Sequence, residues 1–380
     1  MSEAVHRDER FMAQALRLAG RARGRTSPNP MVGSVIVRGD QVVGRGYHRR
    51  AGADHAEIAA LRDAGEAARG AELYVNLEPC NHCGRTGPCT RAIMDAGVER
   101  VVVGMGDPNP LVNGKGIRAL RRRGVKVTVG VLKQECRQLN EAFLCYMGLR
   151  RPLVTLKTAI TLDGRVAAAG GDARWVTGPE ARRQGHRMRD QSDVIMVGVG
   201  TVLADDPSLT CRDIRGGQDP MRVVVDSRLR TPPGAAVVQA AAASRAPTLI
   251  VTTDGAPANR ARALEGAGAQ VLRLPAERGV DGKRQVPLAD MLTALSDREI
   301  VTVMLEGGPR LAGALWSRGL VDRLVAFVAP KVIGDPAALP MLDVGKVPLM
   351  AQATDLEDVK VRRVGVDMMI SGRVARGEDA

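Results

Sequence analysis

Aromatic residues are nearly missing from this sequence, which has three Phe, three Tyr and two Trp among 380 residues. Its hydrophobic cores must therefore be built from Val, Leu, Ile, Ala and Met. No run approaches the roughly 18 apolar residues that a membrane-spanning helix needs. Residues 1–25 mix charges into a helical pattern and lack the apolar stretch of a secretion signal. We expect a cytoplasmic protein without a membrane partner.

Cysteine is also scarce, and half of the cysteines lie within one short stretch. Three of the six cysteines occur in EPCNHCGRTGPC, residues 78–89, whereas Cys136, Cys145 and Cys211 stand alone. This spacing differs from the even framework of a secreted, disulfide-rich domain. It favours a reducing compartment and a single metal cluster. The three isolated cysteines are expected to be small buried hydrophobic residues.

Negative charge is in deficit, since 55 Lys and Arg stand against 42 Asp and Glu and give a net charge of +13. Such a balance favours anionic partners, although a general preference for arginine would explain much of it. Proteins that bind polynucleotides usually combine positive charge with stacking aromatic side chains. Because aromatic residues are so few, we expect phosphorylated small molecules rather than nucleic acid as partners.

The length favours two domains. The first half predicts a helix over 8–23 and strands over 32–37 and 41–47, followed by alternating helices and strands. The pattern restarts near residue 148 with a hairpin that turns at Asp163-Gly164, and 322–334 is expected to be the closing strand. Alternating strands and helices at this spacing predict α/β layered domains, which we place at 1–147 and 148–380.

The triplet His55-Ala56-Glu57 precedes the clustered cysteines. Zinc-dependent deaminases bind their metal through one His and two Cys, and a nearby Glu that is not a ligand moves protons. Three protein ligands leave a fourth position for water, whose pKa zinc lowers from about 15.7 to about 7. We therefore expect Glu57 to be the proton shuttle. Residues two apart do not share a helix face, so His55 should lie at or just before the first turn.

Two cysteines compete for the place of second sulfur ligand beside Cys80. Cys83 would complete a CxxC pair, but the GRTGP that follows it cannot continue a helix. Pro88 suits the first turn of a new helix, and a thiolate at Cys89 would be stabilised by that helix's dipole. This reasoning favours the ligands His55, Cys80 and Cys89. The alternative is a closed structural zinc site made of Cys80, His82, Cys83 and Cys89.

The motifs HAE and LEPCNHCGRTGPC, with PNPMVG before and DPNP after, resemble the bifunctional deaminase/reductase family of riboflavin biosynthesis. The resemblance implies a cytidine-deaminase-like α/β/α domain with zinc ligands at His55, Cys80 and Cys89 and the proton shuttle at Glu57. Cys83 occupies a loop position where the family usually has another residue, and a role as alternate ligand stays open. The candidates to hold the first substrate, from their places beside the metal motif, are Asn29, His82 and Arg85.

Residues 152–374 resemble the second domain of the same family through LKTAITLDGR, WVTGPEAR, RDQSDVIMVGVGTVLADDPSLTCR, VVVDS and EGGPRLAGAL. The resemblance implies a dihydrofolate-reductase-like α/β domain that uses NADPH. The implied cofactor contacts are Ala159, Trp175, Thr201, Asp205, Ser227, Gly308, Pro309, Arg310, Leu311, Ala312, Gly313 and Ala314. The implied substrate contacts are Ala173, Arg189, Leu209, Arg212 and Glu306.

Physical arguments bear on several of these positions. EGGPRLAGAL predicts a strand end, a glycine turn and a helix beginning at Pro309, which would point backbone N–H groups at an anion. Arg189 and Arg212 suit a substrate phosphate because guanidinium groups bind phosphate oxygens in pairs. Lys157, on the first strand of the domain, is a candidate to face the substrate. Core packing is the alternative role for Trp175.

Together these expectations describe two steps on one phosphorylated intermediate, in a homo-oligomeric enzyme. With Zn²⁺, the first domain would hydrolyse the ring amino group of 2,5-diamino-6-(ribosylamino)pyrimidin-4-one 5′-phosphate. With NADPH, the second would reduce the ribosyl chain to give 5-amino-6-(ribitylamino)uracil 5′-phosphate. Two alternatives remain: a nucleic-acid base deaminase with a basic auxiliary domain, and a non-catalytic zinc-stabilised binding protein.

Overall fold

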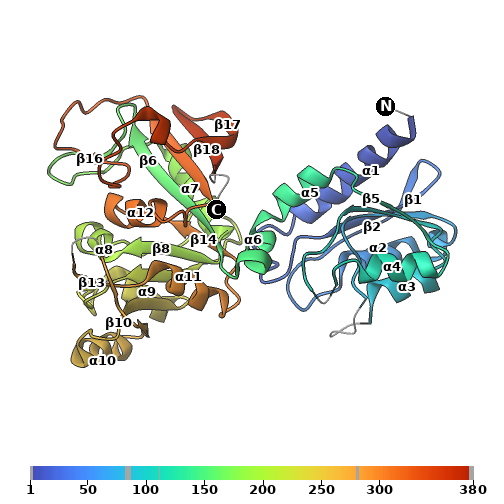
Figure 1. Cartoon of the computed structure of the whole chain (residues 1–380), viewed down its shortest axis with the longest axis horizontal. Coiled ribbons are helices and arrows are strands. Elements are labelled where there is room, and N and C mark those ends of the chain that lie inside the picture. The colour runs from blue at the N-terminus through green and yellow to red at the C-terminus, as the bar shows by residue number, and fades with distance from the viewer. Residues whose placement is uncertain (1–2, 82–86, 111, 280–281, 376–380) are drawn as a thin grey trace. The chain divides into compact units, whose positions relative to one another are not determined.

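In the computed structural model, the chain forms two compact units, Met1–Arg150 and Arg151–Ala380, each built around its own sheet (Figure 1). The structure describes residues 3–81, 87–110, 112–279 and 282–375. Within these ranges every helix is too short or too polar to span a bilayer. Both units are α/β, as the alternation of strands and helices predicts.

The first unit has a five-stranded sheet in the order β2-β1-β3-β4-β5. β1 runs antiparallel to β2 and β3, and β3, β4 and β5 are parallel. The strands are β1 (Gly33–Arg38), β2 (Gln41–Tyr47), β3 (Glu72–Leu77), β4 (Arg100–Met105) and β5 (Lys126–Val129). The helices are α1 (Glu3–Gly20), α2 (Ala56–Ala64), η1 (Gly65–Ala68), α3 (Cys89–Asp95), α4 (Lys115–Arg122), α5 (Lys133–Leu139) and α6 (Glu141–Leu149).

Helices cover both faces of this sheet, with α1 and α5 on one face and α2, α3 and α4 on the other (Figure 1). Successive side chains of a strand point to opposite faces. Val35 and Val37 of β1 accordingly pack with Phe11 of α1, whereas Ile36 packs with Ala60 of α2. The aliphatic side chains expected from the composition therefore form two cores, one on each side of the sheet.

The second unit has a nine-stranded sheet in the order β11-β10-β9-β8-β14-β6-β15-β18-β17. From β11 to β15 all neighbours are parallel, and β18 and β17 add an antiparallel edge. The strands of this sheet are β6 (Leu153–Thr161), β8 (Val194–Gly198), β9 (Met221–Val225), β10 (Thr248–Thr253), β11 (Gln270–Leu274), β14 (Thr302–Leu305), β15 (Arg323–Ala329), β17 (Leu356–Val364) and β18 (Asp367–Val374). Short pairs are formed by β7 (Arg165–Ala167) with β16 (Leu339–Pro340) and by β12 (Glu277–Arg278) with β13 (Arg284–Gln285).

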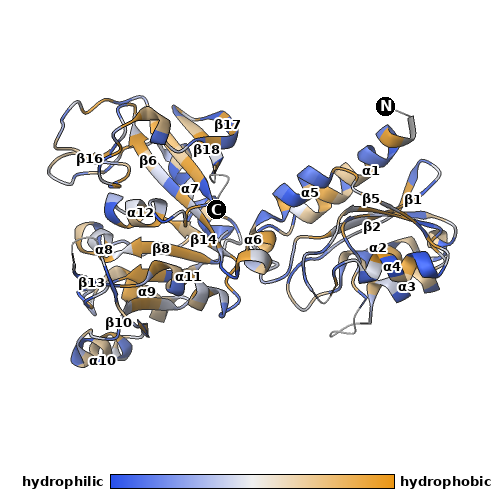
Figure 2. Cartoon of the chain, viewed as in Figure 1, coloured by the Kyte–Doolittle hydropathy of each residue, from blue (hydrophilic) through white to orange (hydrophobic). Residues whose placement is uncertain are grey.

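The central parallel strands β8 and β10 are buried on both faces, and they are coloured mainly as hydrophobic in Figure 2. One core joins them to α11 (Leu288–Ser296) and α12 (Pro309–Trp316). A second core joins them to the remaining helices of the unit. These are α7 (Pro179–Asp190), α8 (Val199–Asp205), α9 (Ala236–Ala243) and α10 (Ala258–Gly266), and η2 (Met350–Gln352) adds a single short turn.

Two expectations for this unit were wrong. The turn at Asp163-Gly164 exists, but β7 pairs with β16 rather than with β6, because the hydroxyl of Thr161 bonds the backbone of Arg165 and closes the turn locally. The strand expected to close the sheet, β15, is followed by the hairpin of β17 and β18. β17 was not predicted because its many charged residues interrupt the alternation of apolar and polar residues by which strands are recognised.

A buried ion pair fastens the start of the second unit to its sheet. Both terminal nitrogens of Arg151 donate to the carboxylate of Asp322 at 2.8 Å, and the backbone N–H of Val154 donates to the same carboxylate.

Asp322→Asn should lower the free energy of unfolding of this unit by about 2 to 3 kcal/mol, because the buried guanidinium loses its counter-charge. Urea unfolding measures the change, and Asp290→Asn, at an exposed position of α11, is the control. An unchanged midpoint would contradict the prediction.

Candidate functional site

His55 is the N-cap residue of α2, as predicted. Its extended backbone (φ −67°, ψ 157°) lets the imidazole turn away from the helix axis while Glu57 lies in the first turn. Gly46 of β2 allows α2 to lie close to the sheet, because an added Cβ there would overlap the carbonyl oxygen of Ala56. The position of the histidine is therefore fixed by the packing of α2 on β2.

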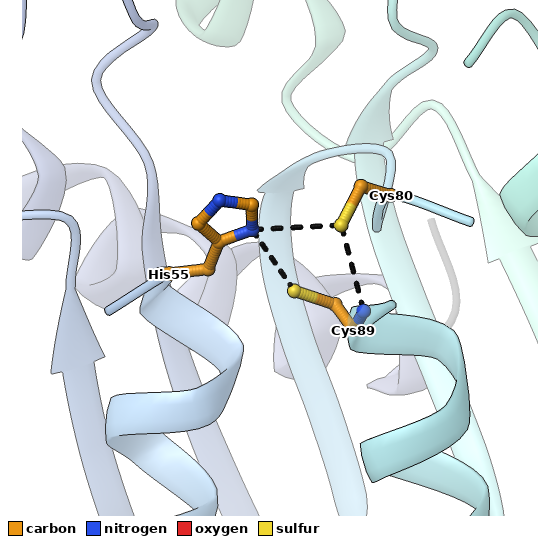
Figure 3. A group of neighbouring side chains, drawn as sticks. All are labelled: His55, Cys80 and Cys89. Atoms are coloured by element: carbon orange, nitrogen blue, oxygen red, sulfur yellow. Dashed lines mark hydrogen bonds between the residues drawn. The ribbon is translucent and has the colours of Figure 1, made fainter. Parts of the chain in front are cut away.

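The two sulfur atoms come from opposite ends of the β3–α3 connection. Cys80 follows β3, and Cys89 is the first residue of α3, with Pro88 as its N-cap. The Nδ1 atom of His55 lies 3.1 Å from Sγ of Cys89 and 3.5 Å from Sγ of Cys80 (Figure 3). The backbone N–H of Cys89 also donates to Sγ of Cys80 at 3.4 Å. The structure thus brings together the three ligands that were favoured.

The donor set fits zinc. All ligand atoms of His55, Cys80 and Cys89 lie within 4.8 Å of one another. Tetrahedral zinc with the usual bond lengths separates a nitrogen and a sulfur ligand by about 3.5 Å, close to the two distances from His55. A hydrogen bond from Cys89 lowers the pKa of Cys80 to about 4, whereas that bond and burial raise the pKa of Cys89. The lowered pKa favours the anionic form of the Cys80 sulfur, which is the form that binds a metal. Three ligands are also the number that leaves a position for water.

Glu57 lies beside these ligands with its carboxyl group buried, at 3% exposure. Burial, together with the negative charge of Cys80, raises the pKa of Glu57 to about 7. The carboxyl group is also hydrogen-bonded to Cys89. A carboxyl group whose pKa lies near the working pH is suited both to accept and to release a proton.

His48 is a neighbour of this cluster that the sequence analysis missed. The buried ring stands edge-on to His55, with ring centres 5.8 Å apart. Its Nδ1 donates to the carbonyl of Asp54, and its Nε2 accepts from the amide of Asn29, at 3.0 and 3.1 Å. Burial lowers the pKa of His48, which keeps the ring neutral. Asn29 is thereby placed near the metal ligands, whereas His82, Cys83 and Arg85 lie outside the described residues.

In the second unit, several expected cofactor positions follow one edge of the sheet. Ala159 is on β6, Gly308 follows β14, Thr201 follows β8 and Ser227 follows β9. These four strands are neighbours in the order β6-β14-β8-β9, and all of them are parallel. The carboxyl ends of β14, β8 and β9 therefore lie at the same edge of the sheet. Ligands of open α/β sheets bind along this edge. An extended molecule lying across the strands could meet all four positions in turn.

The predicted glycine turn leads into α12 with Gly308 as N-cap and Pro309 as the first helical residue. The N–H of Gly308 is not free, because it donates to the hydroxyl of Thr201 at 3.1 Å. An added Cβ at Gly313 would overlap the backbone of Asp343, so this glycine serves close packing. The remaining members of the run, all on α12, are Arg310, Leu311, Ala312 and Ala314.

Trp175 is 61% exposed, which rules out the alternative that it packs in the core. The guanidinium of Arg182 lies 4.5 Å from the centre of the indole ring, and the amine of Lys331 donates to the carbonyl of Trp175 at 2.7 Å. Ala173 belongs to the same loop and accepts from the N–H of Val176. Nearby Asp205, the last residue of α8, uses its carbonyl to accept from Arg174 of this loop.

Glu306, just after β14, forms the centre of a partly buried charged group. Arg189 of α7 binds both carboxylate oxygens at 2.9 and 2.8 Å, and Lys157 of β6 lies 3.9 Å away. Burial alone would raise the pKa of Glu306, but the charges of Lys157 and Arg189 outweigh it and hold the pKa at about 2. Arg189 also donates to the carbonyl of Thr210. Most of its donors are therefore used within the protein.

Arg212 differs from Arg189, because its exposed side chain makes no hydrogen bond or ion pair with the described residues. Its backbone N–H donates to Nδ1 of His186, a second residue that the sequence analysis missed. Leu209 is buried in the same connection, with a left-handed backbone (φ 53°). Of the two arginines considered for phosphate binding, Arg212 is the one whose side-chain donors are all unused by the described residues.

Comparisons with known proteins agree with this geometry. The cytidine and deoxycytidylate deaminase zinc-binding region matches residues 5–105, and the RibD C-terminal domain matches residues 152–370. Riboflavin biosynthesis protein RibD of Aquifex aeolicus is 41% identical over 363 residues, covering 96% of this chain and 97% of that protein. RibD of Escherichia coli K12 is 40% identical over 379 residues, covering 96% and 98%.

Solved structures give the same result. Acinetobacter baumannii RibD has a TM-score of 0.86 at 36% identity, and covers 98% of this chain and 100% of its own. The diaminohydroxyphosphoribosylaminopyrimidine deaminase/5-amino-6-(5-phosphoribosylamino)uracil reductase from Thermotoga maritima has a TM-score of 0.83 at 32% identity, with the same coverage. Since relatives and family models span both units, the chain belongs to the RibD family, the bifunctional deaminase/reductases of riboflavin biosynthesis.

Proposed function

We propose that the first unit deaminates 2,5-diamino-6-(ribosylamino)pyrimidin-4-one 5′-phosphate and that the second then reduces the ribosyl chain with NADPH. The convergence of His55, Cys80 and Cys89 beside the buried Glu57 carries the first half of this proposal. The name of the Thermotoga maritima protein describes the same pair of activities on phosphoribosylated pyrimidines. The product would be 5-amino-6-(ribitylamino)uracil 5′-phosphate.

In the deamination step, His55, Cys80 and Cys89 would hold Zn²⁺, which supplies a bound water of lowered pKa. Glu57 would take the proton from this water and deliver it to the departing ring nitrogen, as its position and raised pKa suit. Asn29, oriented by His48, would hold the pyrimidine, and we assign the same role to His82 and Arg85 from the sequence alone.

In the reduction step, residues at the carboxyl edge of the sheet would hold NADPH, which supplies the hydride when bound. Ala159, Thr201, Ser227 and the turn at Gly308 would position it, with Trp175, Asp205 and the first turns of α12 nearby. Lys157 and Glu306 would face the ribose, and Arg212 would bind the substrate phosphate through its free donors. Arg189 would orient Glu306 rather than bind phosphate itself.

The test supplies this substrate and NADPH, and follows ammonia release and NADPH oxidation together. Ammonia should appear first and NADPH oxidation should follow. Ammonia without NADPH oxidation would refute the assignment of the second unit. No ammonia from zinc-loaded protein would refute the substrate, and single-stranded nucleic acid would be the next substrate to try.

Removing zinc should separate the two activities. A chelator that strips the metal should abolish ammonia release, because water is scarcely ionised at pH 7 unless a metal lowers its pKa. NADPH oxidation on the already deaminated intermediate should continue, since every residue assigned to reduction belongs to the second unit. Added Zn²⁺ should restore ammonia release. Deamination that persists in the metal-free protein would contradict the assignment.

We also propose that the enzyme works in the cytoplasm on small molecules and forms a homo-oligomer. Support for the oligomer comes from the edge strand β17, where Val359 and Val361 are 51% and 61% exposed. Size-exclusion chromatography with light scattering measures the mass, and a monomer at micromolar concentration would contradict this part of the proposal.

A further inference from the structure

Glu78 is a buried carboxylate that no step described above uses. It follows β3 directly, is 4% exposed, and lies two residues before the ligand Cys80. Its backbone N–H donates to the carbonyl of Met105, so that the parallel pairing of β3 with β4 extends one residue further. The main chain is thus fixed in direction just before it reaches the metal cluster.

The side chain of Glu78 binds four backbone N–H groups from the segment that runs from the end of β4 into the first turn of α4. Its Oε1 accepts from Gly116 and Ile117 at 2.9 and 3.1 Å, and its Oε2 accepts from Gly114 and Asp107 at 2.9 and 3.3 Å. Two carboxylate oxygens offer about four acceptor positions, so these bonds use all of them. Bonds from backbone N–H groups to an ionised carboxylate are stronger than neutral ones.

Gly116 brings the same segment against the backbone of the cysteine loop. An added Cβ at Gly116 would overlap the carbonyl oxygen of Pro79, the residue between Glu78 and Cys80. The backbone of this segment therefore contacts the cysteine loop at two places, the side chain of Glu78 and the main chain of Pro79. We call the contacts of Glu78 and Pro79 with Asp107 and residues 114–117 the clasp.

The clasp holds one side of Cys80, and α3 holds the other. The N–H of Thr90 donates to the carbonyl of Cys80 at 3.2 Å, and the hydroxyl of Thr90 donates to the side chain of Asn81 at 2.7 Å. Of the three ligands, Cys80 alone lies outside a helix or helix cap. Its sulfur consequently depends on tertiary contacts of the loop for its position.

We propose that Glu78 is a positioning residue for metal binding, which acts through the clasp to hold Cys80 at the distance from His55 and Cys89 that zinc requires. This inference rests on the proposed zinc-dependent deamination. Glu78 makes no hydrogen bond with the donor atoms of His55, Cys80 or Cys89. Its effect is to hold residues 78–80 in the same position whether or not the metal is bound.

The test compares zinc affinity in the full chain with Glu78→Gln, using competition with a chromogenic chelator. The glutamine keeps the shape but presents an NH₂ group to N–H donors, so at least two of the four bonds are lost. Glu66→Gln, at an exposed position of the same unit, is the control. NADPH oxidation on the deaminated intermediate reports on the second unit of the same molecules.

The zinc Kd of Glu78→Gln should rise by about 10- to 100-fold, the range for residues that orient metal ligands. Glu66→Gln should bind zinc like the wild type, and saturating zinc should restore most of the lost ammonia release. If Glu78→Gln fails to fold, Glu78→Asp makes the same comparison, because it keeps the charge and shortens only the reach. A wild-type zinc Kd in the folded variant, or a deaminase loss that saturating zinc does not restore, would overturn the proposal. A wild-type chain that binds no zinc would instead refute the proposed function.

Discussion

Glu57→Gln should reduce the rate of ammonia release by about 10²- to 10⁴-fold, the usual contribution of a positioned proton-transfer group. The glutamine side chain has nearly the same size and fits the same buried position, but it cannot accept a proton from water. NADPH oxidation should stop when the diaminopyrimidinone is supplied and continue when the deaminated intermediate is supplied. Coupled assays with both substrates measure the two rates.

The control for this prediction is Glu66→Gln, which changes an exposed carboxylate of the same unit and should leave both rates unchanged. Zinc content should stay at the wild-type level in Glu57→Gln, because Glu57 is not one of the three clustered ligands. Wild-type ammonia release by a zinc-loaded Glu57→Gln protein would contradict the role given to this residue. It would instead show that a group other than Glu57 moves the proton.

The second large effect is expected for Glu306→Gln in the second unit. The change leaves the partly buried charges of Arg189 and Lys157 without their shared carboxylate. Losing hydrogen bonds to a charged group in this way typically costs about 1.5 to 3 kcal/mol of folding free energy. Urea unfolding should show this loss, and NADPH oxidation should fall with it while ammonia release continues. Normal reductase activity in a folded variant would contradict the proposed role of Glu306.

The same variant should change how stability depends on pH. The pKa of Glu306 is about 2 in the folded chain, whereas an unfolded glutamate titrates near 4.3. A depressed pKa means that the unfolded chain binds the proton more readily, so this stabilisation is present above pH about 5 and is lost as pH falls towards 2. The wild-type protein should therefore lose stability more steeply than Glu306→Gln over that range. Equal slopes would show that Glu306 is not held ionised.

The cluster of His55, Cys80 and Cys89 was predictable because each part of the motif has a local physical reason. A glycine and proline break after Cys83 forces a new helix to begin, and the structure places Cys89 at its first position. Likewise, the spacing of His55 and Glu57 requires the histidine to precede the helix, and it is the N-cap. Such constraints act within a few residues and are visible in the sequence.

Contacts between distant parts of the chain were not predictable in this way. Arg189 was expected to bind phosphate, but Glu306, which lies 117 residues further along, binds its guanidinium. His48 carries no signal that separates it from any other histidine until β2 and α2 pack together. The charged strand β17 was missed because its residues are exposed on both faces of the sheet edge. These features depend on the tertiary arrangement rather than on local propensity.

The strand order of the second unit has a consequence for synthesis on the ribosome. β6 is the first strand of this unit to emerge, yet its neighbours in the sheet are β14 and β15, near the end of the chain. The first unit pairs strands that are close in sequence and can close its sheet while translation continues. The apolar strand β6 instead stays unpaired until residues 302–329 have been synthesised. We therefore expect chaperone binding or aggregation while the second unit is still being synthesised.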